Sequence, residues 1–219
     1  MGGLTHLENV LFDLDGTLVD SSGTIASSLV HALEKAGMDA GDQEAVESYI
    51  GVPLFDIFIG GFGMSESQAL KAIDDYRAYY DALQQAGTQV YNGIPEVLAG
   101  LRDKGYQLYI ATVKPTEIAE KVLGDLELRP YFDGVAGASM GPERRDKRSI
   151  IAHALETFGL DASRSIMVGD RDQDIEGARS NGMRSLGVTY GFGSRNEVAG
   201  CGPDHLADAA GDIAGLLIR

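Results

Sequence analysis

The sequence of 219 residues has one cysteine, no tryptophan and no long apolar run. Because Cys201 is the only cysteine, an internal disulfide is excluded. Uninterrupted apolar stretches are only a few residues long, so we expect no segment to span a bilayer. The first residues, MGGLTHLENV, contain neither a basic stretch nor an apolar core of the kind found in secretory leaders. These absences predict a protein of a reducing compartment, the cytoplasm.

Basic side chains are also scarce, with 18 Lys and Arg against 33 Asp and Glu and a net charge of −15. Such a surface repels nucleic-acid phosphates and anionic membranes, so we expect neither as a partner. An anionic substrate would need a local reversal of charge. The hydrophobic fraction of 44% excludes fibrous and disordered classes, and the length suits one domain or one domain with an insert.

Five short apolar runs bounded by polar or glycine residues predict buried strands. They are Val10–Phe12, Leu108–Ala111, Val135–Ala136, Ile166–Val168 and Leu186–Val188. Helical patterns separate them, at Ile94–Lys104, Thr116–Leu126, Lys147–Phe158, Ile175–Asn181 and Ile213–Ile218. This alternation predicts an α/β fold, a Rossmann-like parallel sheet flanked by helices.

Residues 21–90 interrupt the alternation, because they contain helical patterns and no evident strand. The first helix carries apolar residues at helical spacing from Ile25 and ends at Gly37, and the last carries them from Ala69 to Leu83. Between them, residues 49–63 are rich in glycine and apolar side chains, which indicates a loop able to face a ligand. We therefore expect a catalytic core of residues 1–20 and 91–219 and an inserted all-helical cap of residues 21–90.

The segment DLDGTLVD, residues 13–20, directly follows the first predicted strand. Asp13 would lie at the carboxyl edge of the sheet, where open α/β folds bind ligands. Asp15 would lie in the following loop, where Gly16 permits a tight turn and frees backbone N–H groups for an anion. An acidic turn that caps a helix is the alternative interpretation of this pattern.

A second acidic segment, GDRDQD, follows the predicted strand Ile166–Val168. An EF-hand needs glycine at its sixth position and glutamate at its twelfth, and counted from Asp170 these are Ile175 and Asn181, which excludes a calcium loop. Asp170 at a strand end, followed four residues later by Asp174, suits one hard cation with oxygen ligands. Mg²⁺ takes one or two carboxylates together with substrate phosphate oxygens.

Thr112, after a predicted strand, and Lys147, at the start of a predicted helix, are placed at the same edge of the sheet. A hydroxyl and an ammonium there suit the oxygens of a transferring phosphoryl group. Alternatively, Thr112 is an ordinary strand-end residue and Lys147, in the charged segment ERRDKRS, is solvated. The sequence contains no Gly-Lys-Ser/Thr loop, and Gly191-Phe192-Gly193 lacks the third glycine of the dinucleotide fingerprint.

In chain order, these positions resemble the four motifs of the haloacid dehalogenase superfamily, specifically its phosphoglycolate-phosphatase-like group with a helical (C1) cap. DLDGTLVD resembles the first motif, Thr112 the second, Lys147 the third and GDRDQD the fourth. The resemblance covers essentially the whole chain, and residues 21–90 stand where that group carries its cap.

The resemblance implies Mg²⁺-dependent hydrolysis of a phosphomonoester through an aspartyl phosphate. Asp13 corresponds to the nucleophile and Asp15 to the general acid and base. Asp13, Asp170 and the backbone carbonyl of Asp15 correspond to the Mg²⁺ ligands. Thr112 and Lys147 correspond to the residues that hold phosphoryl oxygens, and Asp174 to a supporting group that orients water or Lys147.

Two positions depart from the family pattern. The second motif reads Thr-Val-Lys at residues 112–114, where Thr-Asn-Lys is commoner. The third motif lacks the frequent Lys-Pro-x-Pro form, so Arg144 or Arg145 is an alternative to Lys147. We prefer Lys147 because it best matches the position just before the following helix.

The substrate is expected to be a small phosphorylated metabolite. Residues 21–90 contain three basic and ten acidic side chains, a net charge of −7, which disfavours a highly anionic leaving group. We place phosphoglycolate slightly ahead of a 5′-nucleotide. A phosphomutase, which shares the four motifs, and a non-catalytic module that binds phosphate for regulation are the alternatives. Both a monomer and a homodimer are compatible with the sequence.

Overall fold

The computed structural model describes residues 7–139 and 143–218. The chain divides into two compact units, one formed by Met1–Asp20 with Val90–Arg219 and the other by Ser21–Gln89. We call the first the core unit and the second the helical unit. Among the described residues, no helix is both long enough and apolar enough to cross a membrane.

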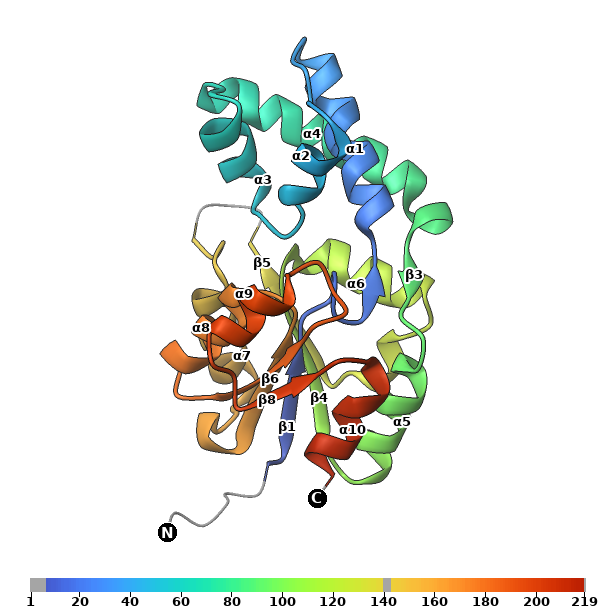
Figure 1. Ribbon diagram of the computed structural model, residues 1–219, viewed down its shortest axis with the longest axis vertical. Coiled ribbons are helices and arrows are strands. Elements are labelled where there is room, and N and C mark those ends of the chain that lie inside the picture. Colours follow the sequence, from blue (N-terminus) through green and yellow to red (C-terminus); the bar gives the residue numbers. More distant parts are fainter. Residues whose placement is uncertain (1–6, 140–142, 219) are drawn as a thin grey trace. The chain divides into compact units, whose positions relative to one another are not determined.

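The core unit is built on a six-stranded sheet with the order β5-β4-β1-β6-β7-β8 (Figure 1). All neighbouring strands are parallel. The strands are β1 (Asn9–Phe12), β4 (Gln107–Pro115), β5 (Gly134–Ala138), β6 (Ser165–Gly169), β7 (Arg184–Val188) and β8 (His205–Ala207). The predicted α/β class with a Rossmann-like parallel sheet is therefore confirmed.

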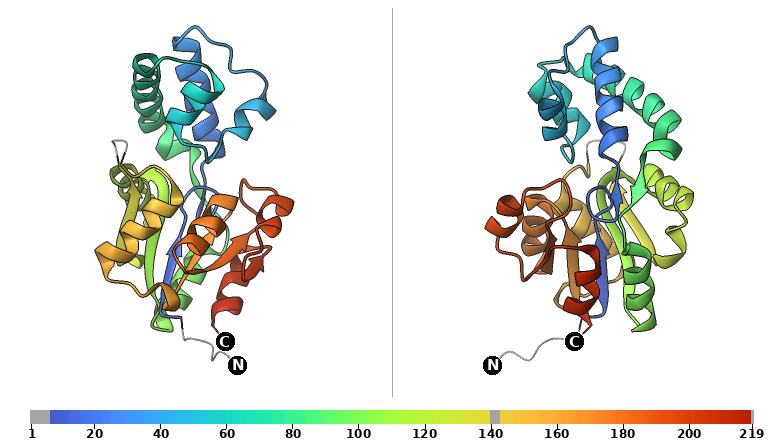
Figure 2. Two further views of the ribbon diagram at one scale, coloured as in Figure 1. Left: turned by 90° about the vertical axis from the view of Figure 1, so that its left-hand side faces the viewer. Right: turned by 45° about the vertical axis from the view of Figure 1, so that its right-hand side comes forward.

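Two layers of helices cover the two faces of this sheet (Figure 2), and a hydrophobic cluster packs each layer against the strands. Val10 and Phe12 of β1 face one layer, which contains α5 (Ile94–Asp103), α6 (Thr116–Asp125) and α10 (Ala210–Leu217). Leu11, between them, faces the other layer, which contains α7 (Lys147–Phe158) and α8 (Asp172–Ser180). The apolar run of β1 is continuous because both of its faces are buried. A further helix, α9 (Arg195–Gly200), packs against β7 and α8.

Local sequence signals set the limits of α7. The Asp146 side chain caps its first turn by accepting a hydrogen bond from the backbone N–H of Ser149 at 2.9 Å. Gly159, in the left-handed conformation with φ 65°, ends the helix. These signals place Lys147 at the first helical position, directly after the cap.

The helical unit contains α1 (Ser22–Lys35), α2 (Gln43–Ser48), α3 (Leu54–Asp56), a π-helical turn (Ile57–Gly61) and α4 (Glu66–Gly87), with α1 packed along α4. Residues 49–63 differ from the expected loop, since part of them is helical. Ile57 and Phe58 are buried there, in the π-helical turn that packs against α4.

Several elements of the structure were not expected from the sequence. β4 continues beyond Ala111 to Pro115, with a shift of register against β5 between Thr112 and Pro115. β8 and α9 lie in a segment without a clear periodic pattern, and two short strands, β2 (Val19–Asp20) and β3 (Gln89–Val90), form a separate sheet.

Candidate active site

Asp13 directly follows β1 and is buried. Its backbone N–H donates to the carbonyl oxygen of Val168 in the neighbouring strand β6 at 2.9 Å. Its side-chain Oδ1 accepts a hydrogen bond from the backbone N–H of Leu14 at 2.8 Å. The carboxylate is therefore fixed at the carboxyl edge of the sheet, between two central strands.

Gly16 allows the loop after Asp13 to approach the second acidic segment. It has φ +84°, and a Cβ atom there would lie 2.3 Å from Oδ2 of Asp170. The next residue, Thr17, donates from Oγ1 to Oδ1 of Asp170 at 3.0 Å. Because only glycine combines this backbone conformation with the lack of a side chain, Gly16 is required for the two segments to meet.

Asp170 follows β6, and Asp174 lies in the first turn of α8; both are fully buried. Oδ2 of Asp174 accepts a hydrogen bond from the backbone N–H of Arg171 at 3.1 Å. Carboxylate oxygens of Asp13, Asp170 and Asp174 lie within 4.8 Å of one another. Three hard oxygen donors at this spacing fit a divalent cation such as Mg²⁺.

Lys147 is fully buried, with only 1% of its side chain exposed. Its Nζ lies 2.9 Å from Oδ1 of Asp13, 2.7 Å from Oδ1 of Asp174 and 3.0 Å from the carbonyl oxygen of Ala111. Burial alone lowers the pKa of this ammonium, but the charges of Asp13 and Asp174 outweigh burial and hold the pKa above its usual value. Lys147 is therefore a buried cation in contact with two of the three carboxylates.

One ammonium does not neutralise three buried carboxylates. Burial raises the pKa of Asp170, and the charges of Asp174 and Asp13 raise it further against the hydrogen bonds that it accepts. Burial also raises the pKa of Asp174, although Lys147 opposes that shift. A second positive charge in the cluster would offset this repulsion.

Thr112 and Arg144 have local partners. Thr112 is buried in β4, in register with Gly137 of β5, and its Oγ1 accepts a hydrogen bond from the backbone N–H of Lys114 at 3.3 Å. Arg144 donates from Nε to the carbonyl oxygen of Gly137 at 2.9 Å. Of Arg144 and Lys147, the structure brings Lys147 to Asp13.

Asp15 has a partner that sequence reasoning did not name. Its Oδ2 lies 2.5 Å from Nζ of Lys114. The sequence position of Lys114 could have suggested this pairing. Lys114 lies two residues after Thr112, in a segment expected to reach the same edge of the sheet as Asp15.

The segment Tyr190-Gly191-Phe192-Gly193 also belongs to the site. Oδ2 of Asp170 accepts hydrogen bonds from the backbone N–H groups of Phe192 at 2.8 Å and Gly193 at 3.4 Å. The Tyr190 hydroxyl donates to the carbonyl oxygen of Thr17 at 2.8 Å. Two glycines closely following the predicted strand Leu186–Val188 were the signal for a backbone that approaches this edge of the sheet.

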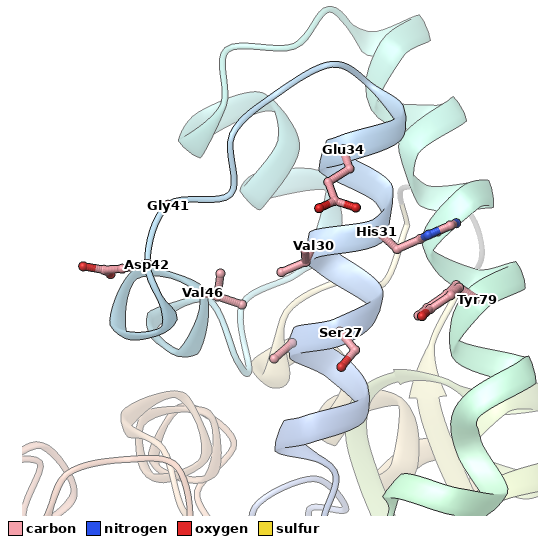
Figure 3. A pocket seen from close by; sticks show the side chains of 9 residues that line it. Ser27, Val30, His31, Glu34, Gly41, Asp42, Val46 and Tyr79 are labelled. Carbon is pink, nitrogen blue, oxygen red and sulfur yellow. The ribbon is translucent and has the colours of Figure 1, made fainter.

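A cleft of about 380 Å³ lies in the helical unit, between α1, α2 and α4 (Figure 3). Figure 3 shows Val30 of α1 and Val46 of α2 pointing toward each other. The His31 ring stacks on Tyr79 of α4, with 4.1 Å between ring centroids. All of the lining residues belong to the helical unit, and none of the predicted site residues is among them.

Comparison with known proteins identifies one family. The model of the family described as haloacid dehalogenase-like hydrolase matches residues 10–188. A 5′-nucleotidase of Pseudomonas aeruginosa is 36% identical over 208 residues, which are 95% of this chain and 93% of that protein. A phosphoglycolate phosphatase of Vibrio parahaemolyticus is 30% identical over 214 residues, 93% of each chain.

A tyrosine-protein kinase, PtkA of Mycobacterium tuberculosis, is 37% identical over 184 residues, which are 84% of this chain and 62% of that protein. Among solved structures, a predicted phosphatase from Clostridium acetobutylicum superposes with a TM-score of 0.92 at 34% identity. That match covers 98% of this chain and 99% of the other. The likeness thus extends over both units.

Proposed function

The chain belongs to the haloacid dehalogenase-like hydrolase family and is a phosphoric monoester hydrolase, and from this premise we propose that it acts on a small phosphomonoester through an aspartyl phosphate on Asp13, with Mg²⁺ as cofactor. The observation that carries the proposal is the fixed carboxylate of Asp13. Oδ1 is held by the Leu14 N–H and by Lys147, so Oδ2 is the oxygen that attacks phosphorus.

Two steps complete the reaction. In the first, Oδ2 of Asp13 forms a bond to phosphorus while the bond to the leaving oxygen breaks, and Asp15 gives a proton to that oxygen. In the second, a water molecule attacks the phosphorus of the aspartyl phosphate and Asp15 accepts its proton. Phosphate is released and the Asp13 carboxylate is restored.

Positive charge must offset the repulsion between substrate and carboxylates. Asp13, Asp170 and the backbone carbonyl of Asp15 would hold Mg²⁺, which supplies charge neutralisation at the phosphoryl oxygens when bound. We propose that the Thr112 hydroxyl binds a phosphoryl oxygen. Lys147 already has three oxygens within 3.0 Å, so it holds Asp13 in place and binds a phosphoryl oxygen by exchanging one of these contacts. Gly16 and Asp174 support this arrangement.

The choice of substrate rests on the charge of the leaving group. Residues 21–90, with ten acidic and three basic side chains, disfavour an anionic leaving group such as glycolate more than an uncharged nucleoside. We therefore propose a nucleoside 5′-monophosphate as the first substrate and phosphoglycolate as the second, the reverse of the order expected from the sequence. The Pseudomonas aeruginosa relative named 5′-nucleotidase supports the first, and the Vibrio parahaemolyticus phosphatase the second.

A substrate panel with the purified full chain tests this proposal. Nucleoside 5′-monophosphates, phosphoglycolate, hexose phosphates and 4-nitrophenyl phosphate are compared by phosphate release, with Mg²⁺ and with a chelator. We expect Mg²⁺-dependent release, with kcat/KM greatest for a 5′-nucleotide. Release from none of these esters would contradict the proposal.

Three further measurements separate the alternatives. Isomerisation of a hexose phosphate without phosphate release would indicate a phosphomutase, and phosphate binding without turnover would indicate a regulatory module. Because one relative is named a tyrosine kinase, transfer of phosphate from ATP to tyrosine is measured in parallel.

A further inference from the structure

The ion pair between Lys114 and Asp15 differs from the surface pairs of the core unit. Its two side chains are 8% and 14% exposed, whereas those of the Lys121–Asp125 pair are 48% and 30% exposed. Removing both charges from water costs free energy, and the attraction between the charges does not always offset this cost. A largely buried ion pair is therefore weak evidence that the two residues serve stability alone. Asp15, the partner of Lys114 in this ion pair, is the proposed general acid and base.

The backbone beneath Lys114 is held in one position. A Cβ on Gly137 would lie 2.4 Å from the carbonyl oxygen of Lys114, so β5 and this end of β4 touch backbone to backbone. The Gly137 N–H also donates to Oγ1 of Thr116 at 3.0 Å, and the Lys114 N–H donates to Oγ1 of Thr112 at 3.3 Å. Lys114 thus extends from a rigid strand end, at the irregular register that precedes α6.

We propose that Lys114 is a positioning residue that holds the carboxylate of Asp15 in the orientation needed for proton transfer; this inference rests on the proposed function. The ammonium engages Oδ2, so the proton that Asp15 exchanges with the leaving group is carried by Oδ1. Lys147 anchors Asp13 and Lys114 anchors Asp15. The nucleophile and the acid therefore have separate cations, supplied by different elements.

The leaving group of the substrate provides the test. An alkyl phosphate needs a proton on its departing oxygen, whereas 4-nitrophenolate departs without one. We expect Lys114→Met to slow formation of the phosphoenzyme from an alkyl phosphate by about tenfold or more, and from 4-nitrophenyl phosphate by less than about twofold, because only the first reaction uses Asp15 as an acid. Both rates are measured by rapid quench at saturating Mg²⁺, with KM determined for each ester.

Matched variants complete the experiment. Lys121→Met makes the same substitution in an exposed ion pair of the core unit, and we expect it to change neither rate. Lys114→Arg retains a cation on a long side chain, and we expect it to recover part of the alkyl phosphate rate. Thermal unfolding of each variant establishes that it is folded.

Three results would overturn the inference: an equal loss with both esters, a loss carried by KM, or no loss with the alkyl phosphate. The proposed function is tested separately in the same assay. If it fails, wild-type protein forms no acid-stable phosphoenzyme from 4-nitrophenyl phosphate; if only the inference fails, wild-type protein forms it and the Lys114→Met variant shows one of these three results.

Discussion

At the level of single residues, Asp13 gains its proposed role from the difference between its two oxygens. Oδ1 lies 2.8 Å from the Leu14 nitrogen and 2.9 Å from Nζ of Lys147, which fixes the carboxyl group without engaging the attacking oxygen. Asp13→Asn keeps the size of the side chain and an acceptor at Oδ1, but it removes the nucleophilic oxygen.

We expect Asp13→Asn to lower phosphate release at least about a thousandfold, since removal of a nucleophile eliminates the covalent route. Phosphate release and circular dichroism measure activity and folding in the same preparations. Asp103→Asn, at an exposed position, is the control and should retain wild-type activity. Comparable activity of Asp13→Asn and wild-type protein would rule out Asp13 as the nucleophile.

Tyrosine titration gives a prediction about pH. Burial raises the pKa of Tyr91 and Tyr190, and nearby carboxylates including Asp170 raise both further. An unfolded tyrosine has a pKa near 10.0, so at higher pH the unfolded chain loses these protons while the folded chain keeps them. The folded state then binds more protons, and the free energy of unfolding decreases as the pH rises above about 10.

The tyrosinate absorbance measures this effect without interference from tryptophan, which the chain lacks. We expect fewer than nine tyrosines of the native protein to ionise near their ordinary pKa, and the remainder to ionise on unfolding. Tyr190→Phe should remove one of the late ionisations. Simultaneous ionisation of all nine in the native protein would contradict the prediction.

At the level of elements, the turn between β1 and β2 depends on Gly16. Gly16 and Gly105 have similar backbone conformations, with φ +84° and +87°, but a Cβ would clash with Asp170 only at Gly16. We expect each Gly→Ala substitution to cost about 1 to 2 kcal/mol of stability from the left-handed conformation. Gly16→Ala should also lower activity by about tenfold or more, because it displaces a proposed Mg²⁺ ligand.

Urea unfolding and phosphate release distinguish these two contributions. Gly105→Ala is the control, since it introduces the same backbone strain far from any close neighbour. It should lose stability and keep its activity. Equal activities of the two variants would show that the approach of Gly16 to Asp170 is dispensable.

The sequence predicted the elements that have a clear hydrophobic pattern or clear residues at their ends, and it missed the elements without such signals. The five apolar runs correspond to β1, β4, β5, β6 and β7, and α7 has the predicted limits, Lys147–Phe158. His205–Ala207 is a short edge strand with only Ala207 buried, so it shows no apolar run. The extension of β4 to Pro115 depends on contact with Gly137, which periodicity does not reveal.

The site was predictable in part for the same reason. Side chains at strand ends or helix starts, such as Asp13, Asp170 and Lys147, could be placed from the parallel topology. The Phe192 N–H that binds Asp170 is a backbone group, so only the glycines on either side of it indicated that this segment approaches the site. Lys114 followed a motif residue, but its pairing with Asp15 depends on the irregular backbone of β4.

At the level of the whole molecule, the net charge is −15, and some of the carboxylates that contribute to it lie together in one buried cluster. Stability measurements can detect a cation that binds this cluster. Asp13, Asp170 and Asp174 are buried within 4.8 Å of one another around one lysine. A cation that binds the folded cluster and not the unfolded chain raises the free energy of unfolding, by about 2.7 kcal/mol at one hundred times its dissociation constant. We therefore expect Mg²⁺ to raise Tm in a saturable manner.

The acidic surface of the protein also attracts Mg²⁺ without specificity. The prediction is therefore tested by comparing two variants. Asp170→Asn removes one charge from the cluster, whereas Asp103→Asn removes one from an exposed position, and both leave the same net charge. At constant ionic strength, we expect the Mg²⁺-dependent rise in Tm to persist in Asp103→Asn and to be largely lost in Asp170→Asn. An equal rise in both variants would assign the effect to general screening of the acidic surface, because only binding at the cluster depends on which of the two carboxylates is removed.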